Sequence, residues 1–403
     1  MNRRTRFAII ALVVVVAAAV GIAVVLGQSS STSSSVPKLP TGTLSAKDRA
    51  TLDAAAQAVV KAPAPKGSSV PAVPGLWFGL WDPEKGAYVS AVGEARADGT
   101  AATVEDSFRI GSITKTFTAA VVLDLVGDGK IDLDGTVKQY LPALAAKHPQ
   151  IADITVDELL RMKSGIPDYA NVPTNGVVPQ VIKDPTRVWK TDELIDIGVN
   201  GGVTRGKAGY STTNYLILGE IAAAVTGTPI EKLITDRVAE PLGLRKTSLP
   251  EPASTAAPQP QTRGYVTDAQ EIKALGGDLE LGTDVTDWNS WGQAGGGMWS
   301  TLRELGTFAA SGLGNSLLPD DVVANRMKAA DIGDGLRYGQ GIIKWGPWIG
   351  HEGEALGYEA WALHNTETGV TYVAALNACC GSEALAALGP LLALYPNDAK
   401  YFL

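Results

Sequence analysis

The chain has 403 residues, of which 45% are hydrophobic, and its formal net charge is -8. This length allows either one large enzyme domain with insertions or two to three smaller domains. The basic residues are dispersed along an acidic chain, which argues against the clustered positive charge of a nucleic-acid-binding protein. No solenoid-type repeat is present.

The N-terminus predicts export. Residues 1–6 are short and basic, and residues 7–27 are apolar without a charge, which is long enough to span a bilayer as a helix. The basic flank predicts that the first residues stay in the cytoplasm. A cleaved signal peptide, which would make the protein secreted, is the competing interpretation, but its apolar region is usually only about 7 to 15 residues. We therefore expect a membrane anchor, a Ser- and Pro-rich linker at residues 28–44 and an extracytoplasmic domain at residues 45–403.

The predicted elements of this domain come in a recognisable order. An amphipathic helix at 45–62 precedes two strands joined by a tight turn. A long middle part alternates helical segments with Gly- and Pro-rich loops, and three strands and a closing helix follow. The strands are expected at 75–82, 87–95, 348–353, 357–365 and 369–378, and the helices of the middle and end at 155–165, 190–199, 214–227, 229–243, 300–312 and 382–395.

This order predicts an α+β fold. Adjacent strands joined by hairpins are most simply antiparallel, so both chain ends are expected to build one antiparallel sheet of about five or more strands flanked by helices. Residues 45–130 and 301–403 would form this α/β part, and residues 131–300 a mainly helical inserted subdomain. A cleft between the two parts is the expected place for a site.

The two cysteines, Cys379 and Cys380, are adjacent. An exported protein can form disulfides, but neighbouring residues bridge only with strained geometry. We therefore expect two small buried apolar side chains at a strand end.

The segment "RIGSITKTFTAAVVLDLV" places Ser112 and Lys115 at the start of an apolar helix. In the first helical turn, unpaired N–H groups and the helix dipole favour a developing alkoxide on Ser112. Lys115 shares a helix face with it and becomes a base when burial lowers its pKa. A serine cap followed by a solvated lysine is the alternative, and four residues alone do not exclude it.

Two later stretches supply further candidate groups. Tyr210 precedes a helix in "KAGYSTTNYLILGEI", and His351 lies on a short strand in "WIGHEGEALGYEAW". A tyrosine beside two cations would have a lowered pKa and would move protons to a leaving group. Taken singly, a packed aromatic ring and a strand-surface histidine are the simpler interpretations.

Taken together, Ser-x-x-Lys, Tyr-Ser-x and His-x-Gly in this order resemble the serine β-lactamase and penicillin-binding protein superfamily. The sequence is most similar to the branch of class C β-lactamases, D-Ala-D-Ala carboxypeptidases and related esterases. The resemblance extends from about Trp77 to Ala378, through "FRIGSITKTFTA", "ITVDELLRMKSGIPDY", "YSTTNYLILGEIAAAVTG", "AGGGMWSTLRELGTF" and "YGQGI".

The resemblance implies a role for each matched residue. Ser112 would be the acylated nucleophile and Lys115 its proton acceptor. Tyr210 would protonate the leaving group and activate the deacylating water, and His351 would hold positive charge beside it. The backbone N–H groups of Ser112 and Glu354 would form the oxyanion hole.

Two positions depart from the family pattern. Thr212 stands where the family has an asparagine that binds the lysine and the substrate amide, and a hydroxyl offers fewer hydrogen bonds than an amide. Glu352 stands where a threonine or serine helps to bind the substrate carboxylate, beside Gly353. An ionised glutamate about 4 Å from a carboxylate costs about 4 kcal/mol at an effective dielectric constant near 20. Strand alternation puts His351 and Glu352 on opposite faces but does not say which one faces the cleft.

The sequence therefore predicts an exported, membrane-tethered serine hydrolase that forms an acyl-enzyme on Ser112 and resembles D-Ala-D-Ala carboxypeptidases or β-lactamases, with a small molecule or a cell-wall peptide stem as substrate. Thr212 and Glu352 favour an alternative, an esterase or amidase on small acyl substrates without a carboxylate. A catalytically inactive binding protein is a second alternative, which the four catalytic candidates disfavour. Three scattered histidines predict no metal site, no cofactor is expected, and the oligomeric state stays open. Trp288 and Trp291 are either core residues or part of the cleft lining.

Overall fold

The computed structural model describes residues 36–403 except 172–175, 269, 275, 334 and 380–382. The predicted anchor at 7–27 and residues 28–35 of the Ser- and Pro-rich linker lie outside the described residues, whereas residues 36–44 are described. Within the described part of the chain, none of the helices combines the length and apolarity that a membrane crossing needs.

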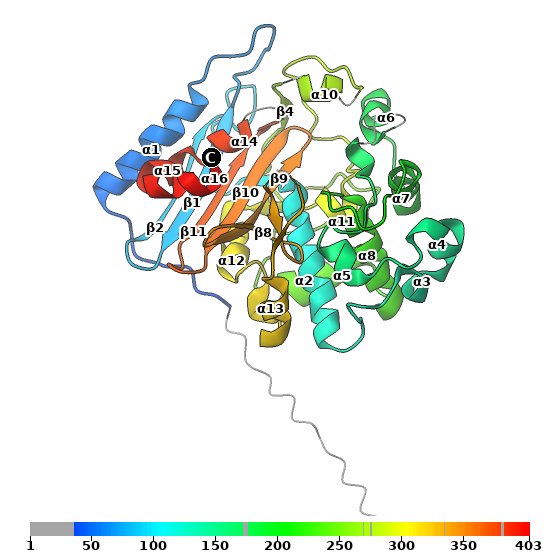
Figure 1. Ribbon diagram of the computed structural model, residues 1–403. Coiled ribbons are helices and arrows are strands. Elements are labelled where there is room, and N and C mark those ends of the chain that lie inside the picture. The colour runs from blue at the N-terminus through cyan, green and yellow to red at the C-terminus, as the bar shows by residue number, and fades with distance from the viewer. Residues whose placement is uncertain (1–35, 172–175, 269, 275, 334, 380–382) are drawn as a thin grey trace, which may run out of the picture. The chain divides into compact units, whose positions relative to one another are not determined.

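An antiparallel sheet of eight strands dominates one side of the described chain (Figure 1). Its strand order is β2-β1-β11-β10-β9-β8-β7-β6. The register pairs Leu76 of β1 with Leu376 of β11, so that the two ends of the domain meet in neighbouring strands of one sheet. The predicted α+β class with an antiparallel sheet is confirmed. The strands are β1 (Gly75–Asp82), β2 (Gly86–Gly93), β6 (Ala330–Asp331), β7 (Arg337–Tyr338), β8 (Ile343–Trp345), β9 (Trp348–Ala355), β10 (Tyr358–Asn365) and β11 (Thr371–Leu376).

Helices cover both faces of this sheet. On one face, α1 (Ala46–Val60) and α15 (Gly389–Leu394) pack together and cover the apolar side chains of Leu76, Phe78 and Leu80. On the other face, α12 (Leu302–Ala310) packs against β1, β10 and β11. This two-sided cover explains why every residue of β1 is buried, although its side chains alternate between the faces.

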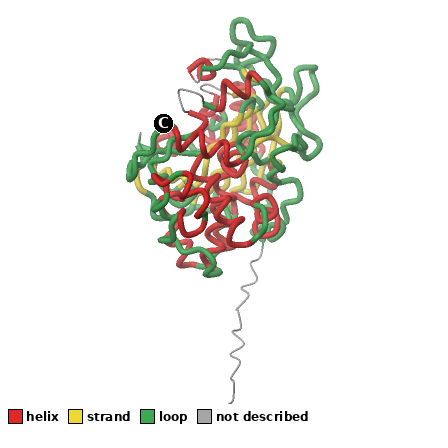
Figure 2. Tube along the Cα trace, turned by 90° about the vertical axis from the view of Figure 1, so that its right-hand side faces the viewer, coloured by secondary structure: helices red, strands yellow, loops and turns green. Residues whose placement is uncertain are grey.

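The middle of the chain is mainly helical, and Figure 2 shows many of these helices gathered at the bottom of the view, apart from the strands. At its centre α2 (Thr114–Gly127) packs against α8 (Thr213–Thr226). The other helices are α3 (Val137–Tyr140), α4 (Pro142–Lys147), α5 (Val156–Leu160), α6 (Val177–Lys183), α7 (Thr191–Asn200), α9 (Ile230–Ile234), α10 (Gln270–Ala274), α11 (Gln293–Gly296), α13 (Asp320–Arg326), α14 (Glu383–Ala386) and α16 (Ala399–Phe402). Four short strands complete the structure: β3 (Ser107–Arg109) pairs with β5 (Trp299–Thr301), and β4 (Tyr265–Val266) pairs with β12 (Ala378–Cys379).

Two local predictions are wrong. The single closing helix expected at 382–395 is two short helices, α14 and α15, because Pro390 occupies the first turn of α15 and cannot continue a helix that enters from before it. Cys379 is buried as expected, but it is disulfide-bonded rather than an unlinked thiol. Cys380 lies outside the described residues.

Candidate active site

Ser112 lies at the junction between the sheet and the helical part. It is the central residue of a 3-10 turn, Gly111–Ile113, that follows β3 and continues into α2. Gly111 has a φ of +48°, and a Cβ atom there would lie 2.4 Å from the carbonyl oxygen of Glu354. Only glycine fits this close approach, which brings the β9 backbone beside Ser112.

Lys115 is buried directly beneath Ser112, with its side chain closed to solvent. Its Nζ lies 2.9 Å from Ser112 Oγ and donates a hydrogen bond of 2.7 Å to the carbonyl oxygen of Gly295. Burial lowers the Lys115 pKa from 10.5 to about 7, while the charge of Asp168 acts in the opposite direction. A neutral amine that donates to Gly295 keeps its lone pair for the Ser112 proton, which is the geometry of a general base.

The half-buried Tyr210 ring lies on the other side of Ser112. The Lys115 Nζ is 4.8 Å from the ring centre. Burial raises the Tyr210 pKa well above its usual value, although a hydrogen-bonding interaction with the Ser112 side chain acts in the opposite direction. The expectation of a lowered tyrosine pKa is therefore wrong, because desolvation has the largest effect and the charges of Asp168 and Glu352 raise the Tyr210 pKa further. Tyr210 is a neutral phenol and hence a proton donor.

His351 lies behind Tyr210, with a ring-centre distance of 6.0 Å, and is 1% exposed. Burial, together with the nearby Lys115, lowers the His351 pKa from 6.5 to about 3. The expectation that His351 holds positive charge beside Tyr210 is therefore wrong. Its imidazole is neutral, since burial disfavours the charged form and the charge of Lys115 adds to this effect.

The rest of the His-x-Gly stretch shows which residues of β9 face the cleft. Glu352 and Glu354 line the cleft and are exposed, whereas His351 and Gly353 are buried. A Cβ atom on Gly353 would lie 2.0 Å from the carbonyl oxygen of Ile110, so this glycine also permits the close contact of β9 with the Ser112 turn. The predicted oxyanion donors, the N–H groups of Ser112 and Glu354, belong to these adjacent backbones, and their role stays a prediction.

The cleft itself is a cavity of ≈ 340 Å³ with Ser112 in its wall. Tyr210 and Thr212 line it together with the two tryptophans, Trp288 and Trp291, that the sequence left between core and cleft. The edge of the Trp291 ring packs against Tyr169, whose hydroxyl donates 2.7 Å to the Trp291 carbonyl oxygen. One wall of the cleft is therefore aromatic and firmly held.

Asp168 is a cleft residue that the sequence analysis did not single out. Thr212 Oγ1 donates a hydrogen bond of 3.0 Å to its Oδ2, and the Ala170 N–H donates 3.1 Å to its Oδ1. The Thr212 hydroxyl, at the position where this sequence departs from the family pattern, thus donates its hydrogen to the Asp168 carboxylate. Asp168 directly follows Gly-Ile-Pro in a segment that resembles the family, so the sequence could have suggested it as a candidate. Only the fold, however, brings it beside Thr212. The nearby Asn214 is buried in α8, where it accepts a hydrogen bond of 2.7 Å from Ser164, as expected for a supporting residue.

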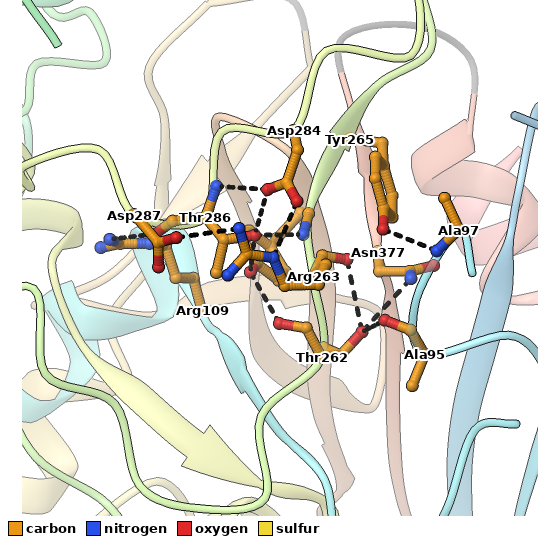
Figure 3. Close-up of polar contacts among 12 residues, drawn as sticks. Ala95, Ala97, Arg109, Thr262, Arg263, Tyr265, Asp284, Thr286, Asp287 and Asn377 are labelled. Carbon is orange, nitrogen blue, oxygen red and sulfur yellow. Dashed lines mark hydrogen bonds and ion pairs between the residues drawn. The ribbon is translucent and has the colours of Figure 1, made fainter. Parts of the chain in front are cut away.

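A polar network fixes the loop that carries the tryptophans (Figure 3). Arg263 pairs with Asp284 and Asp287 at 2.7 and 2.8 Å. Arg109, three residues before Ser112, donates from Nη2 to the carbonyl oxygens of Thr286 and Trp288 at 3.3 and 3.1 Å. The nucleophile turn and the aromatic wall are therefore linked by direct hydrogen bonds.

A half-buried serine with a low-pKa lysine beneath it and a neutral phenol beside it, at the junction of a sheet and a helical part, is typical of serine hydrolases that work through an acyl-enzyme. The family model described as Beta-lactamase matches residues 56–387. The chain belongs to this family.

Two individual relatives match parts of the chain. The chain is 32% identical over 160 residues to penicillin-binding protein 4 of Amycolatopsis lactamdurans and 27% identical over 205 residues to a D-aminopeptidase of Brucella anthropi. These alignments cover 39% and 48% of this chain, but only 40% and 36% of those proteins.

Solved structures match over a larger part of the chain. A D-stereospecific amidohydrolase from Streptomyces sp. is 26% identical with a TM-score of 0.71, covering 86% of this chain and 98% of its own. A D-amino acid amidase from Ochrobactrum anthropi SV3 also has a TM-score of 0.71 at 24% identity, covering 88% of this chain and 99% of its own, and shows the shared fold.

Proposed function

We propose that this protein hydrolyses small amides whose acyl part carries a free amino group and no carboxylate, through an acyl-enzyme on Ser112. One observation carries the proposal: the carboxyl groups of Asp168 and Glu352 line the same cavity as Ser112. The similarity to a D-aminopeptidase and to a D-stereospecific amidohydrolase supports it.

The charge of the cleft supports this choice of substrate. Among the described residues, four that bear a carboxyl group line the cavity, Asp168, Glu352, Glu354 and Glu359, against one guanidinium, Arg109. A substrate carboxylate placed about 4 Å from an ionised Glu352 costs about 4 kcal/mol at an effective dielectric constant near 20, whereas an ammonium group gains a similar amount. The cleft therefore favours a cationic substrate over an anionic one.

The proposed acylation uses the three groups around Ser112. Lys115 accepts the hydroxyl proton as Oγ forms a bond to the amide carbon, and the oxyanion lies between the N–H groups of Ser112 and Glu354. The C–N bond breaks as the neutral Tyr210 phenol protonates the leaving nitrogen. The Lys115 ammonium, 4.8 Å from the Tyr210 ring centre, then returns its proton to the phenolate.

Deacylation reverses the roles. Water attacks the ester carbon and loses a proton to Lys115, with Tyr210 as relay, and Ser112 Oγ leaves the carbon and takes that proton back. Both side chains end in the state in which they began, so the enzyme needs no external proton donor or acceptor for a full cycle.

A D-Ala-D-Ala carboxypeptidase-like or β-lactamase-like activity is the second candidate. It is favoured by the similarity to a penicillin-binding protein and by Arg109, a cation in the cleft wall. Two backbone carbonyls already occupy its Nη2, however, and Glu352 and Glu354 lie on the strand next to Ser112. The acidic strand argues for the amidase.

We also propose that the domain works outside the cytoplasm, tethered by residues 7–27. The support is the uncharged apolar segment with its basic flank. An extracytoplasmic position would expose the enzyme to amides and peptides of the cell surface.

The test is a matched substrate series. D-Phenylalanine amide, its N-acetylated form and an acyl-D-Ala-D-Ala peptide are compared by kcat/KM, with Ser112→Ala as control. We expect the free-amino amide to be hydrolysed at least about 10-fold better than either of the others, which corresponds to about 1.4 kcal/mol. Efficient release of D-alanine from the peptide, or a stable benzylpenicillin adduct on Ser112, would overturn the proposal in favour of the second candidate.

A further inference from the structure

Behind the catalytic groups, His351 has a partner on each ring nitrogen. Its Nδ1 faces the carbonyl oxygen of Glu352, and its Nε2 lies 3.1 Å from the hydroxyl of Tyr338. Both rings are buried, with Tyr338 fully closed to solvent. A carbonyl oxygen only accepts hydrogen bonds, so the hydrogen between Nδ1 and Glu352 belongs to His351.

The donor of the second contact, between Nε2 and Tyr338, then follows. A neutral imidazole carries a single N–H, already placed on Nδ1, so Nε2 has only a lone pair. The Tyr338 hydroxyl must donate to it. Tyr215 Oη lies 3.5 Å from Tyr338 Oη but donates its own hydrogen to the Leu160 carbonyl oxygen at 2.9 Å. Tyr215 Oη is therefore a competing acceptor for the Tyr338 hydrogen, but the shorter contact of 3.1 Å favours donation to His351 Nε2.

We propose that Tyr338 is a positioning residue of the active site, whose hydroxyl hydrogen holds His351 as the neutral Nδ1–H tautomer. Protonation of Nε2 would require the Tyr338 hydroxyl to turn from donor to acceptor, so this hydrogen bond disfavours the cation. The ring then serves as an uncharged wall against Tyr210, with ring centres 6.0 Å apart, while Tyr338 packs edge-on against the same Tyr210 ring at 6.1 Å.

The charge state of His351 also affects Lys115, the proposed general base. A charged His351 would oppose the charge of Lys115, which lies close enough to lower the His351 pKa. The titratable side chains facing His351 are Lys115 from α2, Tyr210 from the loop before α8 and Tyr338 from β7. Both tyrosines have pKa values raised well above the usual range by burial, so Lys115 is the group among them that titrates near neutral pH.

The experiment is imidazole ¹⁵N NMR of the full-length protein in the absence of substrate. The chain has three histidines, His148, His351 and His364, so the spectrum is simple, and His351→Gln assigns the signal. We expect wild-type His351 to show the Nδ1–H tautomer, unprotonated down to pH 5. In Tyr338→Phe, the Nε2 signal should move to that of a nitrogen without a donor, or a second tautomer should appear.

Tyr215→Phe is the matched control, because it removes a hydroxyl from the neighbouring tyrosine that does not donate to His351. Its His351 signals should stay unchanged. An Nε2–H tautomer or an imidazolium in the wild type, unchanged signals in Tyr338→Phe, or equal changes in both variants would each overturn the proposal.

Activity provides a second readout. Tyr338→Phe should lower kcat/KM roughly 3- to 10-fold and alter its pH profile, which corresponds to one lost hydrogen bond, whereas Tyr215→Phe should change neither. The NMR result uses the resting enzyme, so it stands or falls independently of which amide is the substrate.

Discussion

The floor of the cleft, where Lys115 and His351 lie, is closed to solvent, whereas its rim, where Glu352 and Glu354 lie, is open to it. Burial removes charge from the floor: it lowers the pKa of Lys115 to about 7 and that of His351 to about 3. At the rim, burial also raises the pKa of Glu352 above its usual value, but Glu352 and Glu354 keep exposed side chains that solvent can reach. We therefore expect the floor to perform the proton transfers and the rim to select the substrate by its charge.

The largest expected effect is at the floor. Lys115→Met should lower kcat/KM by at least about 1,000-fold, since it removes the general base from an otherwise intact site. A serine-reactive fluorophosphonate should then label Ser112 far more slowly than in wild type. Retained labelling and turnover would show that another group takes the Ser112 proton.

The same substitution should stabilise the fold. The folded-state pKa of Lys115 is lowered, so between pH 7 and 10.5 the unfolded chain binds more protons and wild-type stability rises with pH. Below this window the buried ammonium costs its full penalty. At pH 7 Lys115→Met should therefore raise the free energy of unfolding by a few kcal/mol, on the order of 1.4 kcal/mol per unit of pKa shift, and this gain should fade towards pH 10.5 in urea titrations.

The next largest effect is the acid limb of activity. Neutral Lys115 is the active form and its pKa is about 7, so kcat/KM should rise with pH through 7 and fall about 50-fold from pH 7 to pH 5. His351, with a pKa of about 3, should add no step in this range. A second limb near pH 6.5 that disappears in His351→Gln would mean that the histidine is charged in the working enzyme.

At the rim the expected effect is smaller and concerns selectivity. Glu352→Gln should raise kcat/KM for the acyl-D-Ala-D-Ala peptide relative to D-phenylalanine amide by at least about 10-fold, because a charge at about 4 Å is worth about 1 kcal/mol in water and about 4 kcal/mol at an effective dielectric constant near 20. Glu367→Gln, an exposed glutamate in the turn between β10 and β11, is the matched control and should leave the ratio unchanged. An unchanged ratio in Glu352→Gln would remove the rim from substrate selection.

The two regions also differ in how far the sequence predicts them. Short strand-like runs such as 75–82 and 357–365 were readable, and so was the proximity of Ser112 to Lys115, because both depend on local sequence. The sequence did not predict whether Glu352 faces the cleft. Strand alternation puts His351 and Glu352 on opposite faces but does not say which face lines the cleft.

The charge states of the floor depend on distant segments. A lowered pKa was expected for Tyr210 from two cations beside it, and a positive charge for His351 from the family resemblance, because the extent of burial was not visible in the sequence. Their neutrality follows from burial by α2, by β7 with Tyr338 and by the turn before Ser112. Asp168 escaped notice for the same reason: it is 44 residues away from its partner Thr212 in sequence. Desolvation is a property of the folded chain, so no short sequence motif predicts it.

The smallest expected effect lies between floor and rim, at Thr212. If its hydroxyl aims the Asp168 carboxylate at the substrate amino group, Thr212→Val should raise KM for D-phenylalanine amide roughly 2- to 10-fold, with kcat nearly unchanged, as expected for one lost hydrogen bond that acts on binding. Thr212→Ser keeps the hydroxyl and should restore KM. Because the Thr212 methyl group packs closely against Gly295, whose carbonyl holds Lys115, an equal defect in both variants would assign Thr212 to packing of the floor instead, and the boundary between proton transfer and substrate selection would then lie at Asp168.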